Sequence, residues 1–214
     1  MTEPITMLTD YVLGILALAF GYTILRNNRV DGQTSRLLWA YAFLSLSLST
    51  LVGGTYHGFQ WQDSIGNLLW KITTLSMGFT SLFMTASIVC ANCGGKTHRD
   101  WLVIVGIKFL IYVGLAMTSN DFLLVIGDYG SAMLAILGIA IVQTHSKTRP
   151  EAPWLATGVG VSLIAAGVQA KGISLHEHFN HNDLFHVIQI PALYLFLRGG
   201  LLLADHKEKD VQDG

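Results

Sequence analysis

Seven apolar stretches dominate this sequence, and each is close to the length that crosses a lipid bilayer. A helix needs about 20 mostly apolar residues to span a hydrocarbon core about 30 Å thick. Open strands would leave backbone groups unpaired in lipid, so these stretches must be helices. We therefore predict an all-α polytopic membrane protein, a single seven-transmembrane-helix bundle over residues 1–214. The predicted spans are residues 8–25, 37–59, 65–90, 101–117, 122–143, 154–173 and 184–203.

The composition agrees with a membrane protein and excludes some other classes. Charged residues make up 13% and hydrophobic residues 51% of the chain, whereas soluble domains carry roughly 25% charged residues. The formal net charge of −1 gives no support to nucleic-acid binding. Cys90 and Cys93 are too close together to join distant parts, so no disulfide scaffold is expected. The first stretch lacks a basic leader, which indicates a retained helix rather than a cleavable signal peptide.

Basic residues gather in alternate loops, and this pattern predicts an orientation. Cytoplasmic loops of membrane proteins carry an excess of Lys and Arg. We therefore expect the N-terminus outside and the C-terminus inside, in a multi-pass protein of a plasma membrane or a bacterial inner membrane. The loops predicted to be inside carry Arg26, Arg29 and Arg36, then Lys96 and Arg99, then Lys147 and Arg149, and finally Lys207 and Lys209.

Histidines gather on the other side of this predicted topology. His57 ends the second stretch, and His186 begins the seventh, after three more histidines at 176, 178 and 181. Imidazole is a common metal ligand, and catalytic zinc takes three protein ligands and a water. His57 and His186 are expected to face each other, while His181 reaches the same metal only if the last helix starts after it. Asp63 is the carboxylate nearest to His57 in sequence and is a candidate for taking a proton from the bound water.

Two short motifs carry a family resemblance. The run YHGFQWQDS at 56–64 places a glutamine and an aspartate after the histidine that ends the second span, and NDLFH at 182–186 opens the seventh. Together with seven spans, these motifs resemble the CREST superfamily, which includes alkaline ceramidases and adiponectin-receptor-like proteins. Asn182 stands where that family has the first histidine of an HxxxH motif, and Gly53 stands where it has a serine. The chain is therefore similar to a divergent member.

The resemblance implies a zinc-dependent membrane hydrolase that acts on a lipid amide or ester. His57 and His186 would be zinc ligands. His181, or alternatively His178, would supply the third ligand in place of the histidine missing at Asn182. Asp63 would hold or activate the zinc-bound water. The implied partner is a lipid, whose acyl chain would lie between the helices of the bundle.

Two other functions fit the same sequence. The histidine layer could form a metal- or pH-responsive switch in a non-enzymatic receptor or scaffold, since histidine titrates near neutral pH. A proton-coupled transporter would instead use Asp128, Lys71 and Lys108, which lie inside predicted spans. Lone charges at the bilayer centre cost about 2.5–3.5 kcal/mol on insertion scales. We therefore expect Asp128 to pair with Lys71 or Lys108. Asp183 shares one helical face with Asn182 and His186, and alternatively it stabilises the start of the last helix.

Overall fold

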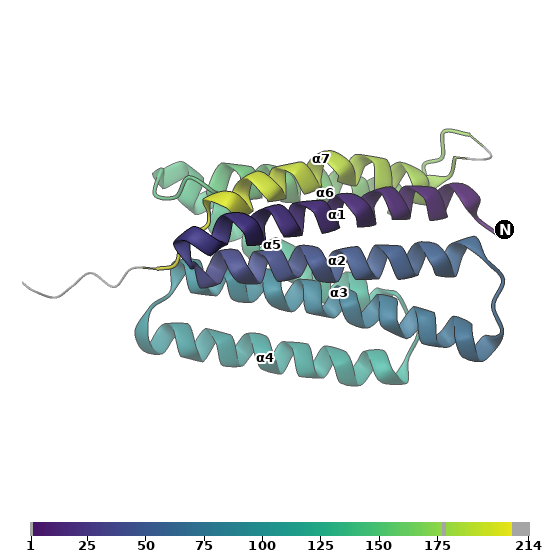
Figure 1. Cartoon of the computed structure of the whole chain (residues 1–214), viewed down its shortest axis with the longest axis horizontal. Coiled ribbons are helices and arrows are strands. Elements are labelled where there is room, and N and C mark those ends of the chain that lie inside the picture. Colours follow the sequence, from purple (N-terminus) through teal and green to yellow (C-terminus); the bar gives the residue numbers. More distant parts are fainter. Residues whose placement is uncertain (1, 177–178, 207–214) are drawn as a thin grey trace, which may run out of the picture.

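The computed structural model describes residues 2–176 and 179–206. The described residues form seven α-helices, each long and apolar enough to cross a membrane. This arrangement confirms the expected all-α fold and indicates a multi-pass membrane protein (Figure 1). The helices are α1 (Pro4–Asp31), α2 (Thr34–Gly58), α3 (Asp63–Asn92), α4 (Gly95–Thr118), α5 (Leu123–Ser146), α6 (Ala152–Ala170) and α7 (His181–Leu202).

Most helices run past the apolar stretches that predict them, and at α1 and α7 local backbone features rather than hydrophobicity set the ends. Pro4 occupies the first turn of α1, where its missing N–H costs nothing. The same helix continues to Asp31 and ends at Gly32, whose φ of 62° is left-handed. Helix α7 starts at His181 rather than at residue 184, because Asn180 caps it.

The helices pack as a bundle in which α1 lies beside both α2 and α7 (Figure 1). Helix α6 packs between α5 and α7, and α3 lies between α2 and α4. Helix α4 packs mainly against α3 and lies at the edge of the bundle. Chain segments far apart in sequence therefore meet where α1 and α7 run side by side.

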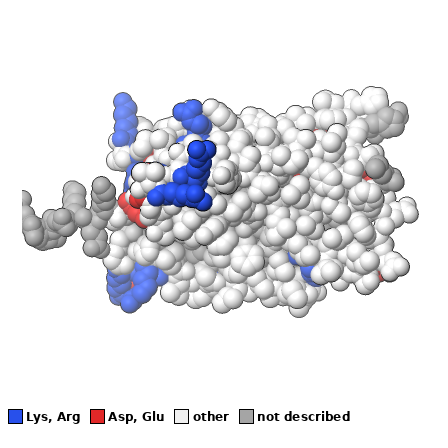
Figure 2. Space-filling view, in the orientation of Figure 1, with Lys and Arg blue, Asp and Glu red and all other residues white. Residues whose placement is uncertain are grey.

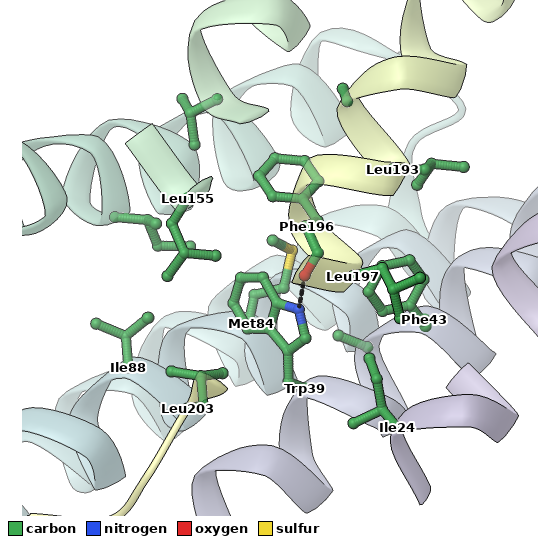
Figure 3. Close-up of a cluster of buried hydrophobic side chains, with 14 of the residues drawn as sticks. Ile24, Trp39, Phe43, Met84, Ile88, Leu155, Leu193, Phe196, Leu197 and Leu203 are labelled. Atoms are coloured by element: carbon green, nitrogen blue, oxygen red, sulfur yellow. Dashed lines mark hydrogen bonds between the residues drawn. The ribbon is translucent and has the colours of Figure 1, made fainter. Parts of the chain in front are cut away.

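Trp39 lies at the centre of the main apolar core and is fully buried (Figure 3). Its indole Nε1 donates a hydrogen bond to the backbone oxygen of Phe196 at 3.0 Å, and the two rings meet edge to face. Gly200 faces the indole, and a side chain there would overlap it. Close packing of this kind, together with interhelical hydrogen bonds, drives helix association in lipid.

The intramembrane charges find partners, as expected. Lys108 on α4 forms an ion pair with Asp128 on α5, with 2.8 Å between Nζ and Oδ1. Lys71 on α3 instead donates to the backbone oxygens of Ala116 and Ser119 at the end of α4. The prediction that Asp128 pairs with a lysine is thus confirmed for Lys108.

Lys and Arg side chains gather at one end of the bundle, which we call the basic end (Figure 2). The α1–α2 turn and the segment after α7 lie there, and the N-terminus lies at the opposite end (Figure 1). The segment after α7 is tied to the bundle: Arg36 donates to the backbone oxygen of Leu203, and Arg149 to that of Ala204 at 3.1 Å. The Asp205 carboxylate accepts hydrogen bonds from the backbone N–H groups of Thr34 and Ser35 at 2.8 and 2.7 Å, and so caps α2.

This cap predicts a loss of stability in acid. Burial raises the pKa of Asp205, but the hydrogen bonds from Ser35 and Thr34 outweigh it and hold the pKa below its ordinary value. The cap therefore stabilises the fold fully above the unfolded-state pKa, about 3.9, and is lost as pH falls through the lower folded-state pKa. We expect Asp205→Asn to reduce the drop in unfolding midpoint between pH 6 and pH 3, measured in detergent. Equal drops in the variant and the parent would contradict the cap.

A candidate acid–histidine site

Three helix ends meet at the end of the bundle opposite the basic end. The N–H groups of Thr2 and Glu3, just before α1, donate to the backbone oxygens of Gly58 and His57 at 3.3 and 3.2 Å. These contacts satisfy carbonyl groups that the end of α2 would otherwise leave unpaired. They also bring two ionisable side chains, from Glu3 and His57, to the same end as the start of α7.

His186 on α7 is held by two adjacent residues of α1. Its ring Nδ1 lies 2.9 Å from the Thr9 hydroxyl, and its Nε2 lies 3.3 Å from Oδ1 of Asp10. The side chains of His186 and Asp10 are only 12% and 8% exposed. Both ring nitrogens are therefore engaged, and both contacts join α7 to α1.

Asp183, one turn before His186, also binds α1. One carboxylate oxygen accepts a hydrogen bond from the Thr6 hydroxyl at 2.8 Å. The other accepts from the backbone N–H of Asn180 at 2.8 Å, while the Asn180 side chain accepts from the N–H groups of Asn182 and Asp183. This reciprocal arrangement is a capping box. It confirms that Asp183 stabilises the start of the last helix.

His57 forms a looser contact at the edge of the same region. Its Nδ1 lies 3.6 Å from Oε2 of Glu3, and its ring contacts those of Tyr56 and Trp70. The His57 side chain is 31% exposed. We call the set Glu3, Asp10, His57, Asp183 and His186 the acid–histidine cluster.

The other predicted site residues lie apart from this cluster. Asp63 is the first residue of α3 and is exposed. The Asn182 side chain accepts a hydrogen bond from Gln169 of α6 at 2.9 Å. His181 is the first residue of α7, and five helical positions place it about 140° around the helix from His186. His178 lies outside the described residues.

Within the described part of the chain, no three His, Cys, Asp or Glu side chains come together as a metal site. The donor types suit zinc, but the arrangement does not. Thr9 and Asp10 take both ring nitrogens of His186, and His57 points to Glu3. The residues as arranged here therefore do not fit the zinc centre that the resemblance implies, and no catalytic step can be assigned to a metal.

Comparison with known proteins gives one match. Residues 5–205 match the model of a family of unknown function, DUF6962. The chain belongs to this family. The matched segment contains all of the acid–histidine cluster except Glu3, and it spans all but the first residue of α1 and the whole of α2 to α7. No curated protein and no solved structure matches this DUF6962 member.

Sequence reasoning missed the contribution of α1 to this site. The residues that α1 and the segment before it contribute, Glu3, Thr6, Thr9 and Asp10, are not among the candidates that the sequence motifs indicate. Asp10 stands directly before a long apolar run, and an ionisable residue at such a place marks a functional site by default. The rule that was applied to ionisable residues in the other predicted spans, applied also to the first, identifies Asp10 on α1 as a candidate.

Proposed function

We propose that this protein is a proton-responsive membrane protein in which the acid–histidine cluster latches α1 to α7. The observation that carries the proposal is the position of His186 between Thr9 and Asp10. Both contacts cross between the two helices, and both involve a ring nitrogen whose role depends on protonation.

One proton beyond those of a neutral ring and an ionised carboxyl group satisfies the whole arrangement. The Thr9 hydroxyl lies 3.1 and 3.0 Å from the backbone oxygens of Ile5 and Thr6, to which it can donate, and so it can accept from Nδ1 of His186. The Nε2 contact with Asp10 then needs a proton, carried either by the ring or by the carboxyl group. Because the two groups are strongly coupled, that proton belongs to the pair rather than to one residue.

Loss of this proton would weaken the latch. A neutral ring has one N–H. If that N–H bridges to Asp10, Nδ1 can only accept, and the Thr9 hydroxyl must turn away from the backbone oxygens of Ile5 and Thr6 to donate to it. Asp10 would then be a buried anion close to a second buried carboxylate, Asp183, with Glu3 also nearby. Other titratable groups at this end include His57, which contacts Glu3, and His181; α6 contributes Gln169, which donates to Asn182. The folded state holds a proton that the unfolded state releases more readily, so stability should fall as pH rises.

The charge pattern indicates from which side of the membrane the proton would reach the cluster. Lys and Arg side chains gather at the end opposite the cluster (Figure 2). By the positive-inside rule the cluster then faces the outside, with the N-terminus outside and the C-terminus inside. The proton that closes the latch would come from the outer compartment of a plasma membrane or a bacterial inner membrane.

The proposal is tested by the pH dependence of stability. In mild detergent, the unfolding midpoint of the parent should fall between about pH 6 and pH 9, and His186→Gln should flatten this dependence. His145→Gln is the matched control, because His145 is exposed at the end of α5 far from the cluster. If the parent and His186→Gln show the same pH dependence, the proposal fails.

A zinc-dependent hydrolase of a lipid amide or ester is the second candidate. It is favoured by one observation: His57 and His186, the ligands implied by the CREST resemblance, lie at the same end of the bundle, in the acid–histidine cluster. It requires both rings to leave their present contacts with Glu3, Thr9 and Asp10, because the arrangement described above does not fit zinc. Elemental analysis of the purified protein tests it, together with turnover of a panel of lipid amides and esters. Stoichiometric zinc that is lost in both His57→Ala and His186→Ala would support this candidate. Purified protein that contains no zinc and turns over none of the lipids would rule out this candidate.

A further inference from the structure

Arg198 on α7 is a cation at the lipid-facing surface near the basic end. Its guanidinium carbon lies 4.6 Å from the centre of the Trp154 ring on α6. One of its nitrogens donates to the Tyr194 hydroxyl at 3.2 Å, one turn earlier on α7. Among the described residues, no carboxylate lies within ion-pair distance of this side chain.

This environment differs from that of the two lysines inside the predicted spans. Lys108 pairs with a carboxylate, and Lys71 donates to two backbone oxygens. Arg198 has five N–H donors, and the contact with Tyr194 uses only one. The Trp154 ring under the guanidinium and the hydrogen bond to Tyr194 hold the Arg198 side chain, and its remaining N–H donors lie in one planar fork.

The Arg198 guanidinium lies at a depth along α7 that suits contact with a lipid headgroup. Arg198 lies four residues before the end of α7, about 6 Å along the helix axis. Trp154 is the third residue of α6, and Trp and Tyr are enriched at the membrane–water interface. Tyr194 and Leu202 are exposed beside Arg198, and they offer apolar surface to an acyl chain.

We propose that Arg198, Trp154 and Tyr194 form a binding site for the phosphate of an anionic phospholipid in the leaflet at the basic end. A planar guanidinium binds phosphate oxygens through two parallel N–H bonds, an arrangement that Lys does not reproduce. The other Lys and Arg side chains at this end raise the local concentration of anionic lipid. The site lies at the opposite end from the acid–histidine cluster and does not depend on its function.

Native mass spectrometry of the full chain in detergent tests this site. The protein is titrated with phosphatidylglycerol or with phosphatidylcholine. The parent should bind phosphatidylglycerol more tightly, and Arg198→Gln should weaken that binding by on the order of tenfold. Arg198→Lys should bind phosphatidylglycerol more weakly than the parent and more tightly than Arg198→Gln. Arg29→Gln is the matched control, because Arg29 is an exposed arginine in the last turn of α1 at the same end.

Three results would overturn the proposal. The first is equal loss of binding in Arg198→Gln and Arg29→Gln, which would indicate diffuse surface charge. The second is equal binding of the two lipids by the parent. The third is competition by inorganic phosphate or glycerol phosphate as strong as by the lipid, which would indicate a site for free phosphate. Trp154→Leu, which leaves the charge in place, should weaken binding as well, and it keeps the test informative if Arg198→Gln does not fold.

Discussion

Replacing Lys108 with methionine is expected to lower the free energy of unfolding by about 3 kcal/mol, because the change strands a buried carboxylate. The Lys108 ammonium contacts Oδ1 and the backbone oxygen of Asp128 at 2.8 and 2.9 Å, and the Ser81 hydroxyl at 2.9 Å. The Asp128 side chain is only 7% exposed, and its Oδ2 has no hydrogen-bond partner. Without Lys108 the charge on Asp128 would have no cation to balance it.

Titration with sodium dodecyl sulfate, followed by circular dichroism, measures this effect. The double variant Lys108→Met with Asp128→Asn should recover most of the loss, because it removes both charges. Lys96→Met, at an exposed position near the start of α4, should change stability by less than about 0.5 kcal/mol. A Lys108→Met protein as stable as the Lys96→Met control would show that the pair contributes nothing.

Replacing Asp183 with alanine is expected to cost about 2–3 kcal/mol, since it removes a helix cap and leaves buried groups unpaired. The backbone N–H of Asn180 and the Thr6 hydroxyl would both lose their acceptor. Asp183 is 1% exposed, so water cannot readily replace it. Asp183→Asn keeps one acceptor oxygen and should lose less.

Asp63→Ala is the matched control for this cap. Asp63 is also an acid in the first turn of a helix, α3, but it is exposed. Its loss should therefore cost less than about 1 kcal/mol. The same detergent titration compares the variants, and equal costs at the two positions would contradict a buried link between α7 and α1.

The helices were predictable because length and hydropathy alone decide which segments can cross a bilayer. All seven predicted helices are present in the described residues, each long and apolar enough to span a membrane, and Asp128 pairs with a lysine as the sequence indicates. The boundaries were less predictable because polar residues extend the helices. Residues 181–183 are polar, yet the capping box of Asn180 and Asp183 makes them the first turn of α7.

Only part of the candidate site could be predicted from the sequence. Topology placed His57 and His186 at one end of the bundle, and the structure agrees. Their partners could not be derived, because Asp10 and His186 are separated by most of the chain, and only the packing of α1 against α7 brings them together. Local spacing likewise indicated Asp63 as the carboxylate nearest to His57, whereas the carboxylate in contact with His57 is that of Glu3.

The distance between α1 and α7 under changing pH tests the latch most directly. Spin labels at Leu8 and Val187, exposed positions on α1 and α7 near the cluster, would report it by double electron–electron resonance, with Cys90 and Cys93 replaced by alanine. The latch predicts a narrow distance distribution near pH 6 and a broader, longer one near pH 9, with no pH dependence in the His186→Gln background. A distribution that is the same at both pH values with His186 in place would contradict it.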